Sequence, residues 1–317
     1  MRVQKILGAL LLVSFAGGVS AQQEDLSRVE IKSAPLGANL YLLTGSGGNI
    51  AALTGADGVL LVDDEFGVLA ERIRAALKAL GAEQAPRFIV NTHYHFDHTD
   101  GNEAFVKMGA LVIAQTQLRS RLAAGGTIGN GGSIAREVKP APAAALPALT
   151  YEQELTLYLD GETVHVHHYP HAHTDGDSVV FFPLARAVHM GDIFVRYGFP
   201  FIDINGGGNV RGMIEACEDV AHSVPPDTKI IPGHGEVATV ADLREYTEML
   251  KATTALVERA LAAGKTLEQM KQEKLLGSYS ERYAPPKAFV DTDAFTESLY
   301  NSLRMPRTRH GPVQRPR

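Results

Sequence analysis

The sequence predicts an α/β fold, a four-layer αββα sandwich with extra helices at its C-terminal end. Short apolar runs with strand-like composition alternate with helical patterns in both halves of the chain, so that the two halves echo each other loosely. An Ala/Pro stretch at 140–147 separates them and predicts an extended crossover. With 317 residues, 45% of them hydrophobic, the chain can bury a large core.

The first half opens with four strand-like runs separated by Gly-rich or Asp-Gly turns. Apolar residues from Leu69 to Leu80 then recur at helical spacing, and the pattern stops at Gly81. A further strand, helix and strand follow. The expected strands are 29–31, 40–44, 49–53, 59–62, 88–90 and 111–114, and the expected helices are 68–80 and 103–108.

The glycine-rich segment 125–133 predicts no regular element, because glycine loses much conformational freedom when it is ordered. The second half repeats the alternation and then ends in amphipathic helical patterns. A basic tail follows from Pro306 and receives no function. The expected strands are 154–159, 163–168, 179–182, 187–190 and 229–231, and the expected helices are 210–220, 240–263, 267–276 and 294–303.

The motif His-Tyr-His-Phe-Asp-His at 93–98 places four metal-binding side chains directly after an apolar strand. Side chains alternate along an extended chain, so His93 and His95 share one side, and Asp97 can follow as the chain turns. Imidazoles and a carboxylate this close are costly to bury without a cation. Nitrogen and oxygen donors of this kind suit zinc better than manganese or iron.

Three further motifs each place a candidate ligand just past a short apolar strand: His173, Asp192 and His234. His171 flanks the same turn as His173. The order of the four motifs, spread over residues 29 to 236, resembles the metallo-β-lactamase-fold hydrolase superfamily. The family motif His-Thr-x-Gly matches residues 173–176, which favours His173 over His171.

This resemblance implies two zinc ions per chain that hold a hydroxide between them. Two adjacent cations can lower the pKa of water from 15.7 towards ~7 and so supply a nucleophile at neutral pH. It also implies that Asp97, besides being a ligand, acts catalytically as a general base or proton shuttle. The implied ligands are His93, His95 and His173 for the first zinc, Asp97, His98 and His234 for the second, and Asp192 as the bridge between them.

Other residues are expected to surround this centre. The segment 194–209 leaves the strand that carries Asp192, so Arg196 could bind a substrate carboxylate, and Asn205 or Asn209 a carbonyl. For Asn209 a helix N-cap is favoured over substrate contact. Asp63 has two interpretations, a helix cap or a carboxylate that orients a metal-binding histidine. For Phe199 and Phe201, packing on the core is favoured over a wall for substrate, and Cys217 is expected to pack in the core. His165, His167 and His189 are expected to pack or to form hydrogen bonds near the centre without binding metal.

The N-terminal residues predict export. Residues 1–5 include two basic side chains, residues 6–13 are largely apolar, and 19–21 end in small residues, which is typical of a cleaved secretory leader with Gln22 as the first mature residue. An uncleaved membrane anchor is the alternative. We therefore expect a periplasmic or secreted protein with no stable membrane association after cleavage. The expected organisation is a leader at 1–21, the sandwich domain at 22–263, and a helical extension with a basic tail at 264–317.

Net charge argues against a nucleic-acid partner. Without Arg2 and Lys5 the chain has 28 basic against 36 acidic residues, so its net charge moves from −6 to −8. A nucleic-acid binder needs a concentrated basic surface instead. A small-molecule substrate is the expected partner.

The favoured reaction is hydrolysis of a β-lactam, because an exported enzyme meets the antibiotic where it acts. The family pattern leaves alternatives open, since known zinc β-lactamases carry Cys or Ser where Asp192 stands, and not all have the equivalent of His98. The presence of both Asp192 and His98 resembles the pattern of lactonases, (thio)esterases of the glyoxalase II type and phosphodiesterases. Iron-dependent oxidoreductases with this fold form a different class, against which a complete second ligand set argues. A purely structural zinc site is disfavoured, because such sites are normally closed and cysteine-rich.

Overall fold

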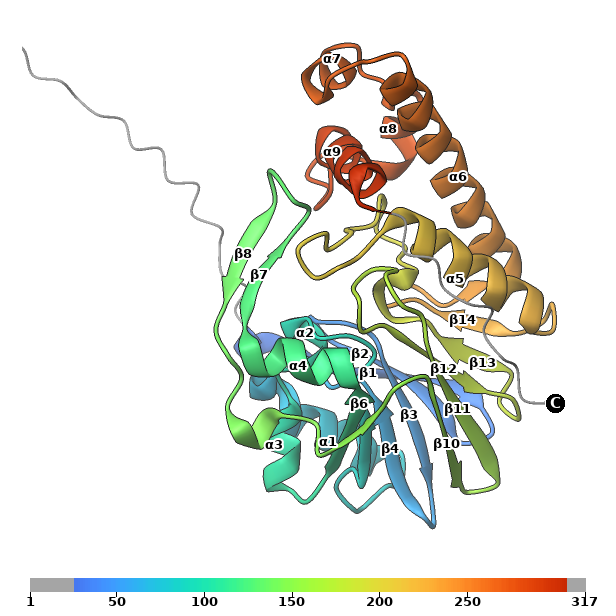
Figure 1. Ribbon diagram of the computed structural model, residues 1–317. Helices are drawn as coiled ribbons and strands as arrows, with labels where there is room; N and C mark the ends of the chain where they lie inside the picture. Colours follow the sequence, from blue (N-terminus) through green and yellow to red (C-terminus); the bar gives the residue numbers. More distant parts are fainter. Residues whose placement is uncertain (1–25, 307–317) are drawn as a thin grey trace, which may run out of the picture.

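The computed structural model describes residues 26–306, and its elements form four layers in the order helix, sheet, sheet, helix (Figure 1). The predicted αββα sandwich is therefore confirmed. The predicted leader and nearly all of the basic tail lie outside the described residues.

The first sheet has the spatial order β1-β2-β3-β4-β5-β6-β9. Its first four strands form an antiparallel meander, and the other three run parallel to the fourth. The bounds of its strands are β1 (Lys32–Gly37), β2 (Leu40–Thr44), β3 (Ile50–Gly55), β4 (Gly58–Val62), β5 (Phe88–Val90), β6 (Leu111–Gln115) and β9 (Leu149–Tyr151).

The second sheet follows chain order from β10 to β15. Its strands are antiparallel except for one parallel pair, the fourth and fifth. The bounds of its strands are β10 (Glu154–Leu159), β11 (Glu162–His168), β12 (Ser178–Phe182), β13 (Ala187–His189), β14 (Lys229–Ile231) and β15 (Ala238–Thr239).

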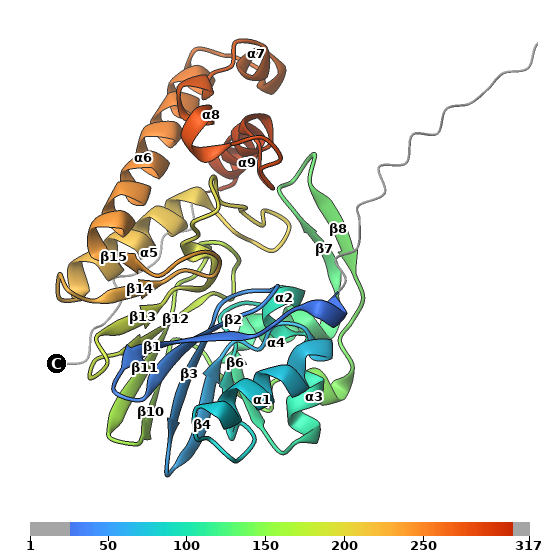
Figure 2. The same ribbon diagram turned by 180° about the vertical axis from the view of Figure 1, so that it is seen from behind.

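Helices cover the outer faces of both sheets, and three more gather at one end of the molecule, as Figure 2 shows from behind. The α-helices are α1 (Ala70–Ala79), α2 (Phe96–Thr99), α3 (Asn102–Lys107), α4 (Thr116–Ala124), α5 (Val210–Ser223), α6 (Val240–Ala262), α7 (Leu267–Gln272), α8 (Gly277–Tyr283) and α9 (Thr292–Arg304). Short 3₁₀ turns lie at η1 (Leu26–Arg28), η2 (Gly67–Leu69), η3 (Ala143–Ala145) and η4 (Gly191–Ile193).

Within residues 26–306 the buried apolar side chains form a cluster at each interface between layers. Ile73 and Phe105 of α1 and α3 pack on the outer face of the first sheet. Phe182 lies in the cluster between the two sheets. The largest cluster joins the second sheet to α5, α6 and α9, and includes Leu250 and Phe295. Each such side chain stabilises the fold by about 1.5–3 kcal/mol when it is fully buried.

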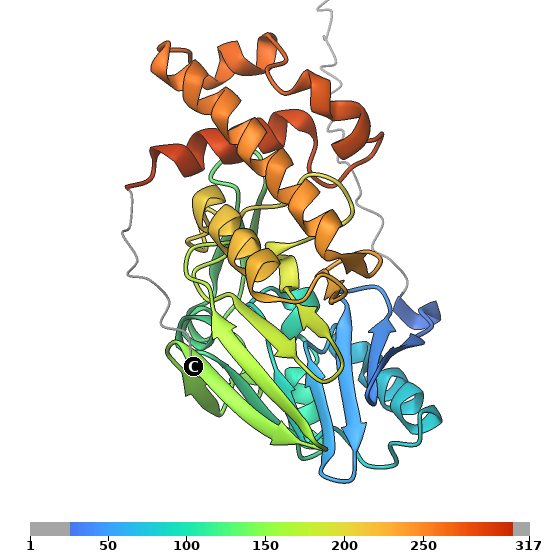
Figure 3. The same cartoon turned by 90° about the vertical axis from the view of Figure 1, so that its right-hand side faces the viewer.

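The C-terminal extension packs onto the sandwich. The long helix α6 crosses α5, with α7 to α9 folded back beside it (Figure 3). α9 also contacts the tip of a β-hairpin: the Asn301 Nδ2 donates to the carbonyl of Asn130 at 3.1 Å, and the backbone N–H of Ser133 donates to Glu297 Oε2 at 2.8 Å. The extension therefore helps to enclose the end of the sandwich where the hairpin stands.

That hairpin corrects one prediction. β7 (Gly126–Gly129) pairs antiparallel with β8 (Ala135–Val138), although segment 125–133 was expected to hold no regular element. The glycines permit it, because Gly125 and Gly126 take positive φ angles of 65° and 132° where the chain enters the strand. A buried carboxylate also accepts the backbone N–H of Gly129, as described below.

Other predictions differ at element boundaries. The expected strand 29–31 is wrong: the first strand begins at Lys32, after η1. Helix α4, strands β9 and β15 and helix α8 were not predicted, and α7 ends at Gln272 instead of continuing to 276. In the described part of the chain no helix has both the length and the apolar character needed to cross a bilayer.

Candidate metal centre

The predicted ligands meet at one edge of the sandwich, because each of them follows a strand end. His93 lies three residues after β5, His173 lies between β11 and β12, and Asp192 is in η4, three residues after β13. Two glycines allow the loops to approach so closely. A Cβ atom at Gly48 would lie 2.1 Å from the ring of His98, and one at Gly233 would lie 1.9 Å from Asp192 Oδ1.

A first group of possible metal ligands comprises His93, His95 and His173, whose donor atoms all lie within 4.8 Å of one another. His173 Nε2 is 3.0 Å from His95 Nδ1. The three rings stand edge to face with centroids 4.7 Å apart, and all three side chains are buried. This arrangement directs three nitrogen atoms at one point.

A second group comprises Asp97, His98 and His234. His234 Nε2 lies 3.3 Å from His98 Nε2 and 3.1 Å from Asp97 Oδ2. Asp192 lies between the groups: its Oδ1 is 3.2 Å from His98 Nε2, and its Oδ2 is 3.9 Å from His173 Nε2. The seven side chains thus form two adjacent donor sets with a carboxylate between them.

The opposite ring nitrogens of four of these histidines have partners outside the centre. His98 Nδ1 lies 2.7 Å from Asp63 Oδ2, and His95 Nε2 lies 3.0 Å from Asp203 Oδ2. The remaining two contacts are His93 Nδ1 with the Thr92 hydroxyl at 3.0 Å and His173 Nδ1 with the carbonyl of Phe201 at 2.9 Å. Such contacts fix the ring orientation and leave the other nitrogen free to bind a metal.

Asp63 also holds the chain that leads into the centre. Its Oδ1 accepts the backbone N–H of Thr92 at 2.7 Å, and its Oδ2 accepts the Thr92 hydroxyl at 2.7 Å. The helix-cap interpretation of Asp63 is wrong, because the next helical turn, η2, is preceded by Phe66 at its N-cap position.

The electrostatics of the centre fit a cation. Burial lowers the pKa of His173 to about 4 and that of His93 well below its usual value, so both rings are neutral and can offer a lone pair. Asp192 and Asp97 raise the pKa of His98 despite its burial, because they favour a positive charge between them. Metal binding would supply that charge in place of a proton.

One buried nitrogen lacks a partner that a metal would supply. His93 Nε2 is buried without a hydrogen bond from any described residue. Leaving such groups unsatisfied costs about 1–3 kcal/mol each. Together with the donor types, nitrogen and oxygen, this fits zinc or a similar transition metal.

Sequence reasoning missed Asp203, which organises the other side of the centre. Its Oδ2 contacts His95 and also accepts the Tyr94 hydroxyl. Its Oδ1 accepts the backbone N–H groups of Gly129 and Gly206, both at 2.9 Å. Asp203 is 108 residues from His95 in sequence and stands in an irregular loop, so no spacing or periodicity indicated the contact.

The three residues predicted to bind substrate, Arg196, Asn205 and Asn209, each contact other parts of the protein. Arg196 Nη1 forms an ion pair with Asp242 Oδ1 at 3.3 Å, while its backbone N–H donates to the carbonyl of His234 at 2.9 Å. Asn205 is exposed beside the β-hairpin, where its backbone N–H donates to Gly129. The N-cap interpretation of Asn209 is confirmed, because its Oδ1 accepts the Arg211 N–H at the start of α5.

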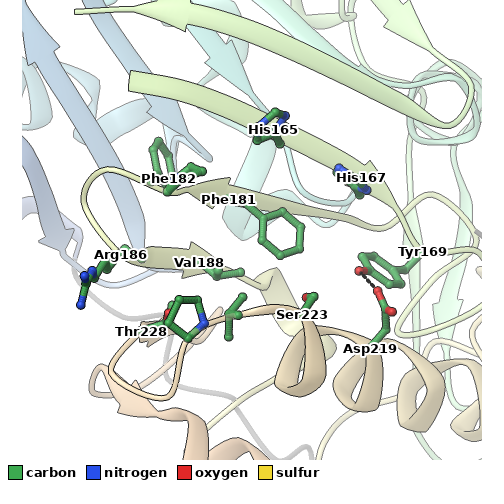
Figure 4. Close-up of a pocket in the computed structure, with 14 residues that line it drawn as sticks. His165, His167, Tyr169, Phe181, Phe182, Arg186, Val188, Asp219, Ser223 and Thr228 are labelled. Carbon is green, nitrogen blue, oxygen red and sulfur yellow. Dashed lines mark hydrogen bonds between the residues drawn. The ribbon is translucent and has the colours of Figure 1, made fainter. Parts of the chain in front are cut away.

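The remaining histidines between residues 26 and 306 lie outside these donor groups. His171 Nδ1 contacts the carbonyl of Gly207 at 2.9 Å. His189 is buried, with its Nε2 2.9 Å from the carbonyl of Asn49. His165 and His167 line a cavity of about 370 Å³ between the second sheet and α5, where the ring of Phe181 stands next to His167 (Figure 4).

Comparison with known proteins agrees with this architecture. The family model described as the metallo-beta-lactamase superfamily matches residues 43–257. Among solved structures, the DIM-1 metallo-beta-lactamase superposes with a TM-score of 0.57 at 19% identity, over 71% of this chain and 99% of the other. A metallo-beta-lactamase from Pontibacter korlensis gives 0.58 at 16% identity, over 70% and 99%. One from Cronobacter sakazakii with a HARLDQ motif gives 0.58 at 20%, over 74% and 95%.

Proposed function

This chain belongs to the metallo-beta-lactamase superfamily and is a metal-dependent hydrolase, and from that premise we propose that it uses two zinc ions to hydrolyse a carbonyl-derived bond of a small molecule, with a β-lactam as the favoured substrate. The observation that carries the proposal is the convergence of two donor groups on either side of Asp192.

The first zinc would be held by the three histidines of the first group, and the second by the three side chains of the second group. Asp192 would contact both ions. Bound zinc would lower the pKa of a water molecule and polarise the substrate carbonyl. The ligand set is His93, His95, His173, Asp97, His98, His234 and Asp192.

Asp97 is the carboxylate in this set best placed to move a proton. About 22% of its side chain remains exposed, against 8% for Asp192. Its Oδ2 is 3.1 Å from His234 Nε2, and the charge of His98 helps to lower the pKa of Asp97 to about 2 although burial opposes this. Asp97 therefore remains a carboxylate at neutral pH and can accept a proton from the attacking water.

A hydrolysis screen of the zinc-loaded protein tests the proposal. The panel contains a chromogenic cephalosporin, a lactone, a thioester and a phosphodiester. We expect turnover of the cephalosporin, and we expect it to cease after chelation and to return with zinc. Turnover of another member without the cephalosporin would replace the β-lactam assignment.

One observation favours that second outcome, a lactonase, (thio)esterase or phosphodiesterase. The residue between the donor groups is a carboxylate, Asp192, and His98 lies beside it. Known zinc β-lactamases carry Cys or Ser at the position of Asp192, and not all have the equivalent of His98. The oxidoreductase alternative is weaker, because a full second donor group is present. Metal analysis of the purified protein separates the two classes: two zinc ions per chain support a hydrolase, and iron supports an oxidoreductase.

Export to the periplasm or the medium is part of the proposal and rests on the leader-like residues 1–21. Fractionation of cells that produce the full chain, with N-terminal sequencing of the product, tests it. A mature protein that begins at Gln22 is the expected result, and retention of Met1 in a membrane fraction would indicate an anchor instead.

A further inference from the structure

An exposed phenylalanine lies close to the metal centre. Phe289 stands between α8 and α9, and 65% of its surface is exposed. Scattered exposed apolar residues are ordinary, but an exposed aromatic side chain that continues a cluster at a functional site points to a ligand. Phe289 also lies outside residues 43–257, the part of the chain matched by the family model.

Phe289 is joined to the metal centre through two other rings. Its centroid lies 5.9 Å from that of Phe201 and 6.3 Å from that of Tyr197. Phe201 in turn is 5.9 Å from the rings of both His95 and His173, and Tyr197 is 5.9 Å from the ring of His234. We call Tyr197, Phe201 and Phe289 the aromatic wall.

The inner part of this wall is fixed by the fold. Phe201 is only 5% exposed, and its carbonyl contacts His173 Nδ1. The Tyr197 hydroxyl accepts the backbone N–H of Phe201 at 3.4 Å. The loop that carries both residues is tied to α8, because the N–H of Phe199 donates to the carbonyl of Tyr283 at 2.8 Å; the loop and the helix lie side by side in Figures 1 and 2.

We propose that the aromatic wall is a binding surface for substrate and that Phe289 is a specificity-determining residue. The substrate class is a molecule with an aromatic or other flat apolar group attached near its scissile carbonyl. When the carbonyl lies at the metal centre, that group would rest on Phe289 and the half-buried Tyr197. This inference rests on the proposed hydrolytic function and specifies its substrate.

The chemistry favours this occupant over a charged group. Stacked or edge-to-face aromatic pairs 4.5–7 Å apart contribute ~0.5–1.5 kcal/mol beyond the burial of their surface. The one cationic side chain on this loop, Arg196, is paired with Asp242, and the one carboxylate, Asp203, contacts His95 and Tyr94. The wall itself offers rings and one hydroxyl that already accepts a backbone hydrogen bond.

Two β-lactams with the same fused ring system test the proposal, one with a phenylacetyl and one with an acetyl side chain. The measured quantity is the kcat/KM of the phenylacetyl compound divided by that of the acetyl compound. In Phe289→Ala this ratio should fall roughly three- to tenfold, which corresponds to the loss of one aromatic contact. In Phe289→Leu, which keeps apolar surface, the ratio should fall less. The matched control is Tyr158→Ala, an aromatic residue on β10 that is 77% exposed, and it should keep the wild-type ratio.

A binding measurement separates this inference from the proposed function. Calorimetric titration of the zinc-loaded protein with 3-phenylpropanoate and with propanoate requires no turnover. We expect the aromatic wall to bind the phenyl compound more tightly than propanoate, and we expect Phe289→Ala to lose that preference. An unchanged kcat/KM ratio together with an unchanged preference would overturn the role of Phe289, even if lactams are hydrolysed. Absence of all hydrolysis with the preference intact would overturn the proposed reaction alone.

Discussion

Asp97 is the side chain on which the proposed reaction depends most directly. Asp97→Ala removes both a donor to the second metal and the acceptor for the proton of water. General-base catalysis alone typically contributes ~10²–10⁴-fold, so kcat should fall at least about a hundredfold. Since part of the side chain is exposed, the fold should persist, and circular dichroism checks this. A near-wild-type rate with two bound zinc ions would show that Asp97 is not part of the mechanism.

Asp203 should act through His95. We expect Asp203→Asn to weaken zinc binding about 10- to 100-fold, the usual effect of losing the partner that orients a ligating histidine. Competition with a chromophoric chelator measures the affinity without reference to turnover. Asp227→Asn is the control, because Asp227 pairs with Arg186 at the surface. If both variants bound zinc equally well, the contact between Asp203 and His95 would have only a structural role.

At the scale of single residues, the sequence indicated the metal ligands better than the residues that orient them. His93, His95, Asp97 and His98 stand in one short motif, and the other three ligands follow strand ends, where loops carry function. Asp203 and Tyr94 meet only after folding, 109 residues apart, so the sequence could not reveal their contact. Asp63 was named with two interpretations, and only the structure shows its contact with His98 and the N-cap position of Phe66 that rejects the helix cap.

Helix α5 illustrates how one side chain fixes an element. Asn209 Oδ1 accepts the Arg211 N–H at 2.9 Å, and its Nδ2 donates to the carbonyl of Ser302 in α9 at 3.1 Å. Asn209→Ala should lower the free energy of unfolding by about 1–2 kcal/mol, since it loses a cap and a tertiary hydrogen bond. Urea unfolding measures the change. Asn205→Ala on the exposed part of the same loop is the control, and an equal loss there would contradict the capping account.

At the scale of elements, apolar segments between clear turn signals were predicted closely, and a glycine-rich segment was not. β2, β5 and β10 occur with the predicted bounds, because their apolar and β-branched residues lie between clear turn signals. The β7–β8 hairpin was missed because tertiary contacts stabilise it. The backbone of Gly129 gains a partner from Asp203 and that of Asn130 gains one from α9, and both partners are far away in sequence. Composition reports the entropy cost of glycine but not these contacts.

At the scale of the whole molecule, the extension at 264–306 shares the core of the sandwich. Met270, Leu276 and Leu299 are fully buried in the same cluster as α5 and α6, and Phe295 stacks on Phe199 with centroids 4.3 Å apart. A chain truncated after Ala263 would expose this surface. Several fully buried side chains at ~1.5–3 kcal/mol each approach the whole stability of a typical domain, 5–15 kcal/mol. We therefore expect the truncated chain not to unfold cooperatively on heating.

A single substitution gives a graded version of that test. Phe295→Ala should cost about 3–5 kcal/mol of unfolding free energy, as for other buried phenylalanines. The exposed Phe289→Ala should cost little, because most of its ring is already in solvent. A truncated chain as stable as the full one would mean that the sandwich domain expected at 22–263 folds without the extension.

The metal centre also links the two halves of the sandwich, so zinc should stabilise the whole fold. His93, His95, Asp97 and His98 come from the first half, and His173, Asp192 and His234 from the second. A ligand that binds only the folded state stabilises it by RT ln(1 + [L]/Kd), ~2.7 kcal/mol at a hundredfold excess over Kd. Chelation should lower the melting temperature, and added zinc should restore it.

In His234→Ala the second donor group is incomplete, so the gain in melting temperature on adding zinc should shrink but not vanish, because the first group is intact. A melting temperature indifferent to zinc would mean that no metal joins the halves, and a full gain in His234→Ala would mean that one site accounts for all the binding.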